Sequence, residues 1–403
     1  MGRACTLRIV AVLGALLSPA AAEDYEAPPV LAASRILPSP LLKSDVHEVH
    51  ERVRTDGYLY QFVMESKFGL YRVDSLALLR VRVHEVRTLA KVIGMKQTDE
   101  FFNGLGTRLE QTADVPVKLL EDPAGTVEQV GKGVEKQLGR IGGFFKKRKK
   151  SKQEDPALNE LLMGMEKRKL AAELDLDVYS TNPKVQEFLK TIAGARASGK
   201  LAVDLAAMAI PGGAGVAVGA AKFSGQVEDL LRDNSPAELY IHNEKKLKAM
   251  GVDSVLIGRF LNHRHLSPRH KTVLVASLEA LDGVAGREVL LTAALDTDKE
   301  SVALFHERRA ALLVQYHARE PLQRIEARHD LPLVTTRKGD RLLLLPVDAA
   351  WWSEETATIL RGLAEDGGRW SFVVTGRLTP RARKGAAALG YAVREGYGLE
   401  PGK

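Results

Sequence analysis

The sequence predicts a mixed α+β protein of three successive units: an N-terminal β-hairpin and helix unit, a central all-helical region and a small C-terminal α/β domain. Apolar residues alternate with polar ones early in the chain, recur at every third or fourth position through its middle, and form short runs after about Leu331. Six prolines that follow helix-capping residues mark helix starts. The length of 403 residues suits two or three such units.

The first 22 residues are predicted to be a secretory signal peptide. MGRACTLR is short and basic, IVAVLGALL is apolar but too short to span a bilayer, and the small residues of SPAAA fit a cleavage site. We therefore expect an exported protein, periplasmic or secreted, either free or peripheral on a membrane. The single cysteine, Cys5, lies in this segment, so the mature chain should form no disulfide. An uncleaved N-terminal anchor is the alternative.

Residues 23–45 contain four prolines and no apolar periodicity, which predicts an extended, proline-rich arm. Residues 46–120 are predicted to form the hairpin and helix unit. Two alternating segments flank Asp56-Gly57, a pair typical of a hairpin turn. A third strand is expected at 70–73, and apolar residues at helical spacing predict an amphipathic helix over residues 75–93 that covers the sheet.

Further helices are predicted to begin where Asp, Asn, Ser or Thr precedes a proline. The side-chain oxygen caps a free amide there, and proline needs no hydrogen-bond partner at the first helical position. These prolines are Pro123, Pro156, Pro183, Pro236, Pro268 and Pro380. Gly251 and Gly283 fall where two of the helices could end in a left-handed cap. Residues 156–325 are therefore predicted to be a helical domain.

The pattern changes again in residues 326–403. PLVTT, RLLLLPV, WSFVVTG and YAVR predict four strands, and helical segments lie between the second and third and between the third and fourth. The order β-β-α-β-α-β is typical of a small α/β domain.

The clearest interaction candidate is the basic amphipathic segment and linker at residues 121–155, which ends in KKRKKSK. Its basic residues are Lys146, Lys147, Arg148, Lys149, Lys150 and Lys152. Such a helix can contact an anionic membrane surface or an acidic protein partner. Nucleic acid is not expected, because no aromatic residues accompany the charge. The alternative is a helix packed on its own domain and followed by a solvated linker, which the interior glycines favour.

An uncharged stretch at residues 205–221 leaves two interpretations open. It is rich in alanine and glycine, and Pro211 interrupts it, which favours tightly packed core pieces. Its 17 residues lie at the lower limit for insertion into a membrane.

Three histidines form a candidate metal site: His263, His265 and His270. Histidines two apart suit a metal on a strand better than on a helix. The neighbouring Arg264 and Arg269 would repel a cation. A polar loop between helices is the competing interpretation.

A candidate ligand pocket is predicted in the C-terminal domain. Asp348 follows one strand, Arg377 follows another, and Trp351 lies nearby as an apolar wall. Loops at the carboxyl ends of strands are where α/β sheets bind ligands. The alternative is that the two charged residues cap loop ends and that the tryptophan belongs to the core.

These patterns favour a non-enzymatic envelope protein that binds or scaffolds through its basic segment. The sequence contains no phosphate-binding loop, nucleophile elbow or dinucleotide fingerprint, so no cofactor is expected. The alternative is a periplasmic hydrolase that uses a histidine-bound metal or the C-terminal loops. The oligomeric state remains open.

Overall fold

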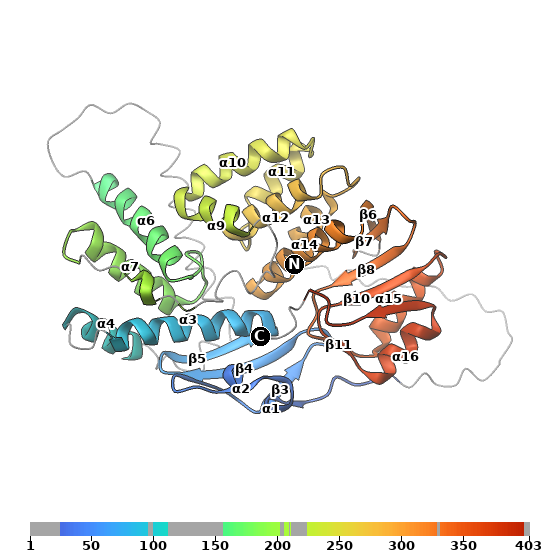
Figure 1. The fold of residues 1–403 in the computed structure, drawn as a ribbon, viewed down its shortest axis with the longest axis horizontal. Helices are drawn as coiled ribbons and strands as arrows, with labels where there is room; N and C mark the ends of the chain where they lie inside the picture. Colours follow the sequence, from blue (N-terminus) through green and yellow to red (C-terminus); the bar gives the residue numbers. More distant parts are fainter. Residues whose placement is uncertain are drawn as a thin grey trace, which may run out of the picture.

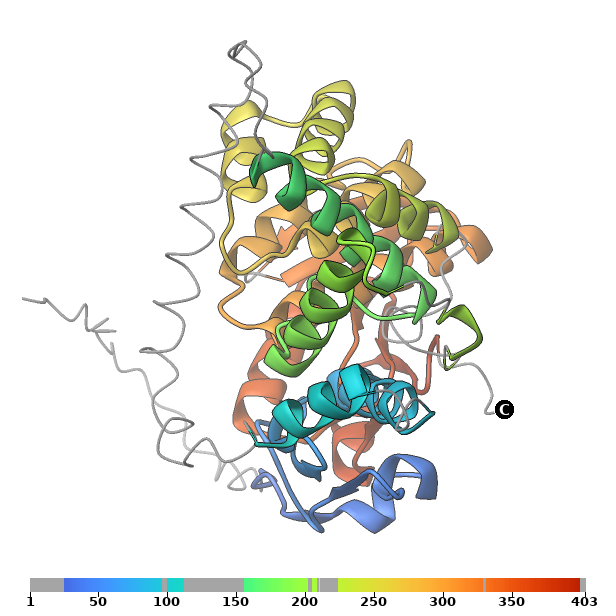
Figure 2. The same ribbon diagram turned by 90° about the vertical axis from the view of Figure 1, so that its left-hand side faces the viewer.

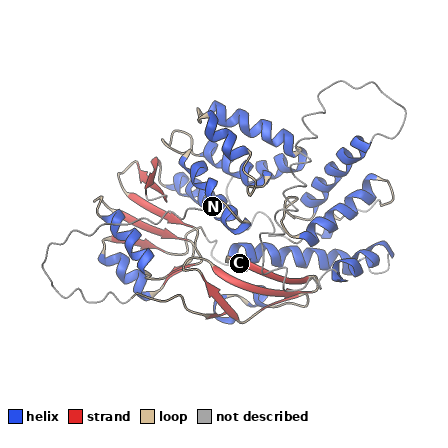
Figure 3. Cartoon of the chain, turned by 180° about the vertical axis from the view of Figure 1, so that it is seen from behind, coloured by secondary structure: helices blue, strands red, loops and turns tan. Residues whose placement is uncertain are grey.

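The computed structural model describes residues 25–95, 100–111, 156–201, 205–208, 210, 224–328 and 331–398, and it confirms the mixed α+β class (Figures 1 and 3). An N-terminal sheet, a group of central helices and a C-terminal sheet follow one another along the chain. The predictions for the signal peptide at residues 1–22 and for the basic segment at residues 121–155 lie outside the described residues. Most of the 205–221 stretch does as well.

The N-terminal sheet is antiparallel. Its strands are β1 (Leu31–Ala32), β2 (His47–Val49), β3 (Arg52–Thr55), β4 (Tyr60–Ser66) and β5 (Gly69–Asp74). The predicted hairpin joins β3 to β4, but its loop is longer than two residues, because Thr55 pairs with Tyr60. The Asp56 carboxylate accepts hydrogen bonds from the Tyr58 and Leu59 amides and so stabilises the longer loop.

The predicted extended arm is largely folded. It contains β1, which pairs with β3, and two short helices, α1 (Ala33–Ile36) and α2 (Ser39–Leu42). Ala33 and Leu37 are buried in the core of the N-terminal unit. Burial of these isolated apolar residues overrides the absence of periodicity from which an extended arm was predicted.

Helix α3 (Leu76–Met95) covers one face of this sheet, as predicted, and α4 (Glu100–Gln111) follows it. Two later helices, α6 (Pro156–Glu173) and α7 (Pro183–Ala197), pack as a pair against the same core. The N-terminal unit therefore includes the first two helices of the predicted helical domain (Figures 1 and 2). A short turn, η2 (Ala206–Met208), comes after α7.

The remaining central helices form a second group: α9 (Ser224–Asp233), α10 (Pro236–Ala249), α11 (Ser254–Leu261), α12 (Pro268–Ala280), α13 (Val289–Ala293), η3 (Ala294–Asp296) and α14 (Glu300–Arg319). Five of the six predicted proline starts are confirmed, at the first residues of α6, α7, α10, α12 and α16. The sixth, Pro123, lies outside the described residues. Gly251 and Gly283 adopt φ 75° just beyond α10 and α12, as predicted for left-handed caps.

The C-terminal sheet has the order β12-β10-β8-β7-β6. Its elements are β6 (Leu322–Arg328), β7 (Leu331–Thr336), β8 (Arg341–Leu345), α15 (Glu354–Ala364), β10 (Trp370–Val374), α16 (Pro380–Ala388) and β12 (Tyr391–Arg394). The strands β9 (Ala349–Ala350) and β11 (Arg377–Leu378) form a separate, two-stranded parallel sheet. The predicted β-β-α-β-α-β order is confirmed. Strand β6 was missed, because a register shift between Leu322 and Arg324 breaks its alternation.

Helices cover both faces of the C-terminal sheet. Residues of α10 to α14 share one apolar core with the face that presents Leu342 and Leu344. Leu343 and Phe372 face the opposite side, where they pack with α15 and α16. The sheet is therefore the middle of three layers, and the last central helices belong to it as well as to the helical region. No helix among the described residues is long and apolar enough to span a membrane.

Gly376 lies where β10 meets β11, and a Cβ atom there would sit 1.9 Å from the backbone oxygen of Asp348. We expect Gly376→Ala to lower the free energy of unfolding by about 1–3 kcal/mol, because a backbone oxygen cannot rotate away. Gly258→Ala is the control, since no atom lies within 4 Å of its Cβ position in α11, and it should be neutral or stabilising. Urea unfolding of both variants checks this, and equal effects would contradict it.

Candidate functional site

The three predicted pocket residues lie together at the carboxyl edge of the C-terminal sheet. Asp348 directly precedes β9, and Arg377 begins β11, where it pairs with Ala349. Trp351 follows β9. Asp348 and Trp351 are buried, and Arg377 is exposed. This edge therefore gathers the residues as expected, but two of them lie inside the molecule.

The N-terminal unit covers this edge. One Asp348 carboxylate oxygen accepts hydrogen bonds from the Tyr60 amide at 3.0 Å and from the Leu76 amide at 2.8 Å. The Asp348 amide donates in turn to the Tyr58 carbonyl at 2.9 Å. The ring of Trp351 packs edge-on against Tyr60, with ring centroids 6.3 Å apart. Asp348 is thus a contact between two units rather than the wall of an open pocket.

Asp348 also caps helix α3 from a distant part of the chain. Leu76 is the first residue of that helix, and its amide has no intrahelical partner. Ser75 precedes it with φ 90°, a strained value for a residue that is not glycine, and its hydroxyl accepts from the Leu78 amide. A carboxylate at this helix end is favoured by the helix dipole.

Burial raises the pKa of Asp348 to about 6. The two backbone amides and the guanidinium of Arg308 act in the opposite direction, because they stabilise the charged carboxylate. Burial prevails, and Asp348 therefore titrates in a range in which most aspartates are fully ionised.

A second carboxylate occupies the same edge. Glu26, near the start of the described chain, accepts from the Trp352 amide at 2.8 Å and from the Thr379 hydroxyl at 2.6 Å. Its own amide donates to the Trp352 carbonyl at 2.9 Å. Tyr25 packs against the apolar cluster of α15 and α16. The chain's own N-terminal segment therefore fills part of the edge where ligands bind in α/β sheets.

The structure divides the three predicted metal-site histidines. The rings of His263 and His265 lie 6.1 Å apart between α11 and α12. His270 is instead buried in α12 and makes a 2.5 Å hydrogen bond through Nδ1 to Glu307 of α14. Among the described residues, no group of three or more His, Cys, Asp and Glu side chains is arranged to hold a metal ion.

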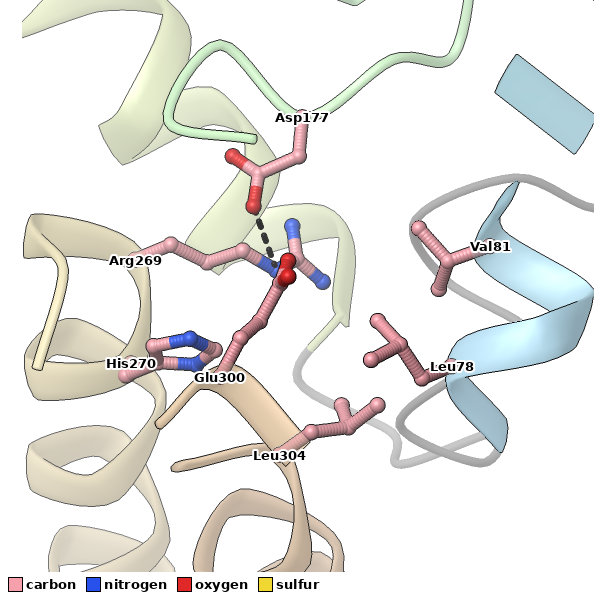
Figure 4. A pocket seen from close by; sticks show the side chains of 7 residues that line it. All are labelled: Leu78, Val81, Asp177, Arg269, His270, Glu300 and Leu304. Atoms are coloured by element: carbon pink, nitrogen blue, oxygen red, sulfur yellow. Dashed lines mark ion pairs between the residues drawn. The ribbon is translucent and has the colours of Figure 1, made fainter. Parts of the chain in front are cut away.

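His270 belongs to a buried polar cluster at the junction of the N-terminal unit and the central helices (Figure 4). Arg269 approaches Asp177 of the α6–α7 loop with an Nε–Oδ2 distance of 3.9 Å and Glu307 with an Nε–Oε1 distance of 3.6 Å. Glu300 reaches the same space from the start of α14. The side chains surround a small cavity of about 30 Å³.

The protonation of this cluster follows from its burial and charges. Burial raises the pKa of Asp177, although Arg269 opposes the shift. Burial alone would lower the pKa of His270, but its hydrogen bond and charge interaction with Glu307 outweigh this and raise it. For Glu307, burial is outweighed by Arg269 and His270, so the pKa is lowered. His270 and Glu307 thus favour a charged pair, while Asp177 retains its proton to higher pH than usual.

Arg82 of α3 extends the cluster. Its guanidinium donates to Glu85 at 2.9 Å and to Thr181 at 2.8 Å, and it pairs with Glu300. Asn182, the N-cap of α7, donates to the same Glu85 at 2.9 Å. Arg82 and Glu85 are both buried. The network therefore connects α3, the α6–α7 loop and α14.

The junction cluster has features of both a functional site and a structural network. Perturbed titratable groups around a cavity are characteristic of functional sites, but buried ion pairs produce the same shifts. The cavity is large enough for only one or a few water molecules. The arrangement therefore suits the hydrogen bonding of water better than the binding of a large substrate.

Most of this cluster was not predicted from the sequence, because its members come from four separate segments. Arg82 and Glu85 lie on the predicted amphipathic helix at positions that disturb its apolar face, which was the available signal. Only His270 was singled out, and it was assigned to a different site.

Comparison with protein-family models, curated proteins and solved structures returns no match for this chain.

Asp348 should make stability depend on pH. Its folded pKa of about 6 lies above the ordinary value of 3.8, so its contribution is complete below pH 3.8 and is lost as pH rises through about 6. Asp348→Asn keeps an oxygen for both amides and removes the titration. We expect this variant to reduce the difference in unfolding free energy between pH 4 and pH 7.5, by roughly 3 kcal/mol or less.

The control for this prediction is Asp348→Ala, which leaves the Tyr60 and Leu76 amides without an acceptor. It should destabilise the protein at both pH values, by about 1–3 kcal/mol for each buried donor. Thermal unfolding of the three proteins provides the measurement. If Asp348→Asn retains the full pH slope of the original protein, the assignment to Asp348 is wrong.

Arg82 provides a test of the junction cluster. Arg82→Met should lower the free energy of unfolding by about 3–5 kcal/mol, because the buried Glu85 and the partly buried Glu300 would lose their cation. Lys248→Met is the matched control, since it breaks an exposed pair with Glu244 and should leave the unfolding midpoint unchanged. Urea unfolding measures both, and a negligible effect at Arg82 would refute a structural role for the cluster.

Proposed function

We propose that this is an exported, non-enzymatic binding or scaffolding protein whose basic segment, residues 121–155, contacts an anionic membrane surface. An acidic groove of a protein partner is the alternative contact. The observation that carries the proposal is the concentration of six basic residues between positions 146 and 152, next to an amphipathic stretch. Each basic residue near an anionic surface contributes about 1 kcal/mol, so six give about 6 kcal/mol, or tens of micromolar affinity at low salt.

The helices on either side of the segment support this proposal. The preceding helix, α4, is held in the core by Phe102, Leu105 and Leu109. The following helix, α6, is held in the same core by Leu170 and Ala171. The basic segment is therefore connected at both ends to one packed unit. Contact between the segment and a surface would attach the whole protein to it.

The other candidate sites also favour binding over catalysis. The carboxyl edge of the C-terminal sheet is covered by Tyr58, Tyr60 and Glu26 of the same chain. In the junction cluster, the charged groups pair with one another around a cavity of water size. Both arrangements stabilise contacts between units. Neither presents reactive groups to a substrate.

Co-sedimentation with vesicles tests the proposal. Residues 23–403 should sediment with anionic phosphatidylglycerol vesicles at low salt, and not with phosphatidylcholine vesicles or at high salt, because salt screens exposed charges. A variant in which the six basic residues of 146–152 are replaced by glutamine should bind more than tenfold more weakly.

A control variant replaces six exposed basic residues elsewhere with glutamine and should bind like the original protein: Lys200, Lys245, Lys248, Arg259, Lys338 and Lys384. Equal loss in the two variants would mean that overall charge, and not the segment, is responsible. Absence of binding to anionic vesicles would reject the surface proposal and leave an acidic partner or a solvated linker. Stoichiometric zinc, manganese or iron in the purified protein would instead support the hydrolase alternative.

A further inference from the structure

The segment Tyr25–Glu26, here called the N-terminal strap, is attached to the C-terminal domain by hydrogen bonds of Glu26 and by apolar packing of Tyr25. Glu26 pairs with Trp352 through both of that residue's backbone groups and with the Thr379 hydroxyl. Trp352 itself is fixed, because its ring lies against α16 at Gly385, where a Cβ atom would come within 2.6 Å of the ring. The strap therefore occupies a preformed site whose walls do not depend on it.

The site is suited to a carboxylate. Trp352 immediately precedes Ser353, the N-cap of α15, and Thr379 is the N-cap of α16. The N-terminal ends of both helices carry partial positive charge. The Thr379 hydroxyl accepts a hydrogen bond from the Ala382 amide and donates one to Glu26. Tyr25 adds apolar contact beside the carboxylate. An extended segment with an aromatic residue followed by glutamate fits this arrangement.

Residues 27–30 link the strap to the N-terminal sheet. This link does not fix the strap in its site. Ala27, Pro28 and Val30 are exposed, and 57% of the surface of Val30 is accessible. Among the described residues, no hydrogen bond of the link appears before β1 begins at Leu31. Two consecutive prolines keep such a link extended. The strap can therefore leave its site without disturbing the rest of the fold.

We propose that the strap is exchangeable and that its site at Trp352 and Thr379 binds the same segment of a second copy of this chain. A second copy carries a sequence that is known to fit, and reciprocal exchange forms every hydrogen bond that it breaks. The short link at residues 27–30 keeps the strap near its own site at an effective concentration of about millimolar. The intact chain should therefore exchange only at comparable local concentration. This inference is independent of the proposed surface contact.

Shortening the link tests the exchange directly. Deletion of Pro28 and Pro29 reduces the greatest distance from Glu26 to Leu31 from about 17 to about 10 Å. This change disfavours binding of the strap within the same chain and leaves exchange available. We expect the shortened chain to be a dimer at micromolar concentration by light scattering. The same chain with Glu26→Gln should return to a monomer, because a neutral amide forms weaker hydrogen bonds than a carboxylate.

A second measurement examines the site without the link. A chain that begins at Ala27 should bind a peptide of residues 25–31, and the peptide with Gln at the position of Glu26 should bind roughly tenfold more weakly. Thr379→Val should abolish binding, whereas Thr379→Ser should retain it. The chain that contains its own strap should bind the peptide at least tenfold more weakly than the chain without it.

Circular dichroism and thermal unfolding establish that each variant is folded. A folded, shortened chain that remains a monomer at hundreds of micromolar would overturn the exchange, whatever the peptide does. Failure of the strapless chain to bind the peptide would overturn the carboxylate site itself. A dimer that persists with Glu26→Gln would show that the chains associate through another surface, and it would also reject the proposal.

Discussion

The Asp348 carboxylate connects the C-terminal domain to the N-terminal unit. It accepts from backbone amides on either side of strand β5, one in β4 and one at the first turn of α3. A buried carboxylate without such donors would be costly, and the donors would be equally costly without it. The position of the N-terminal sheet, the start of α3 and the strained Ser75 therefore all depend on the loop that follows β8.

The junction cluster imposes a similar constraint on the other side of α3. Arg82 must find both Glu85 and Glu300, and His270 must find Glu307, because each would otherwise be a buried charge without a partner. Apolar packing holds α3, α7 and α14 together, but it tolerates small shifts in position. The ion pairs and hydrogen bonds of the cluster require specific positions of their partners. They therefore specify how the two units are oriented more than they add to stability.

The sequence was most informative where a local rule determines the structure. Capped prolines placed helix starts at α7, α10, α12 and α16, since cap and proline act within one turn. The folded arm was missed because its partner strand, β3, lies in another segment that no local pattern reports. Strand β6 was missed because its register shift breaks the alternation of its residues. The same limit applied to the sites. Asp348 was predicted to belong to a ligand pocket at a strand end, but the amides that it accepts from lie more than 270 residues away in the chain.

Asp348 and Glu26, the two carboxylates at the carboxyl edge of the C-terminal sheet, differ in what would be lost if each left its hydrogen-bond partners. Asp348 cannot leave without uncapping α3 and exposing the Tyr60 and Leu76 amides, so that contact lasts as long as the fold does. Glu26 is held by three hydrogen bonds, together with the packing of Tyr25, and the link behind it is exposed, which is why we propose that this contact can exchange. The edge is therefore closed by one permanent and one removable contact. The strap and the exposed Arg377 are therefore the parts of this edge that a partner can reach, while the basic segment lies elsewhere in the chain, between α4 and α6.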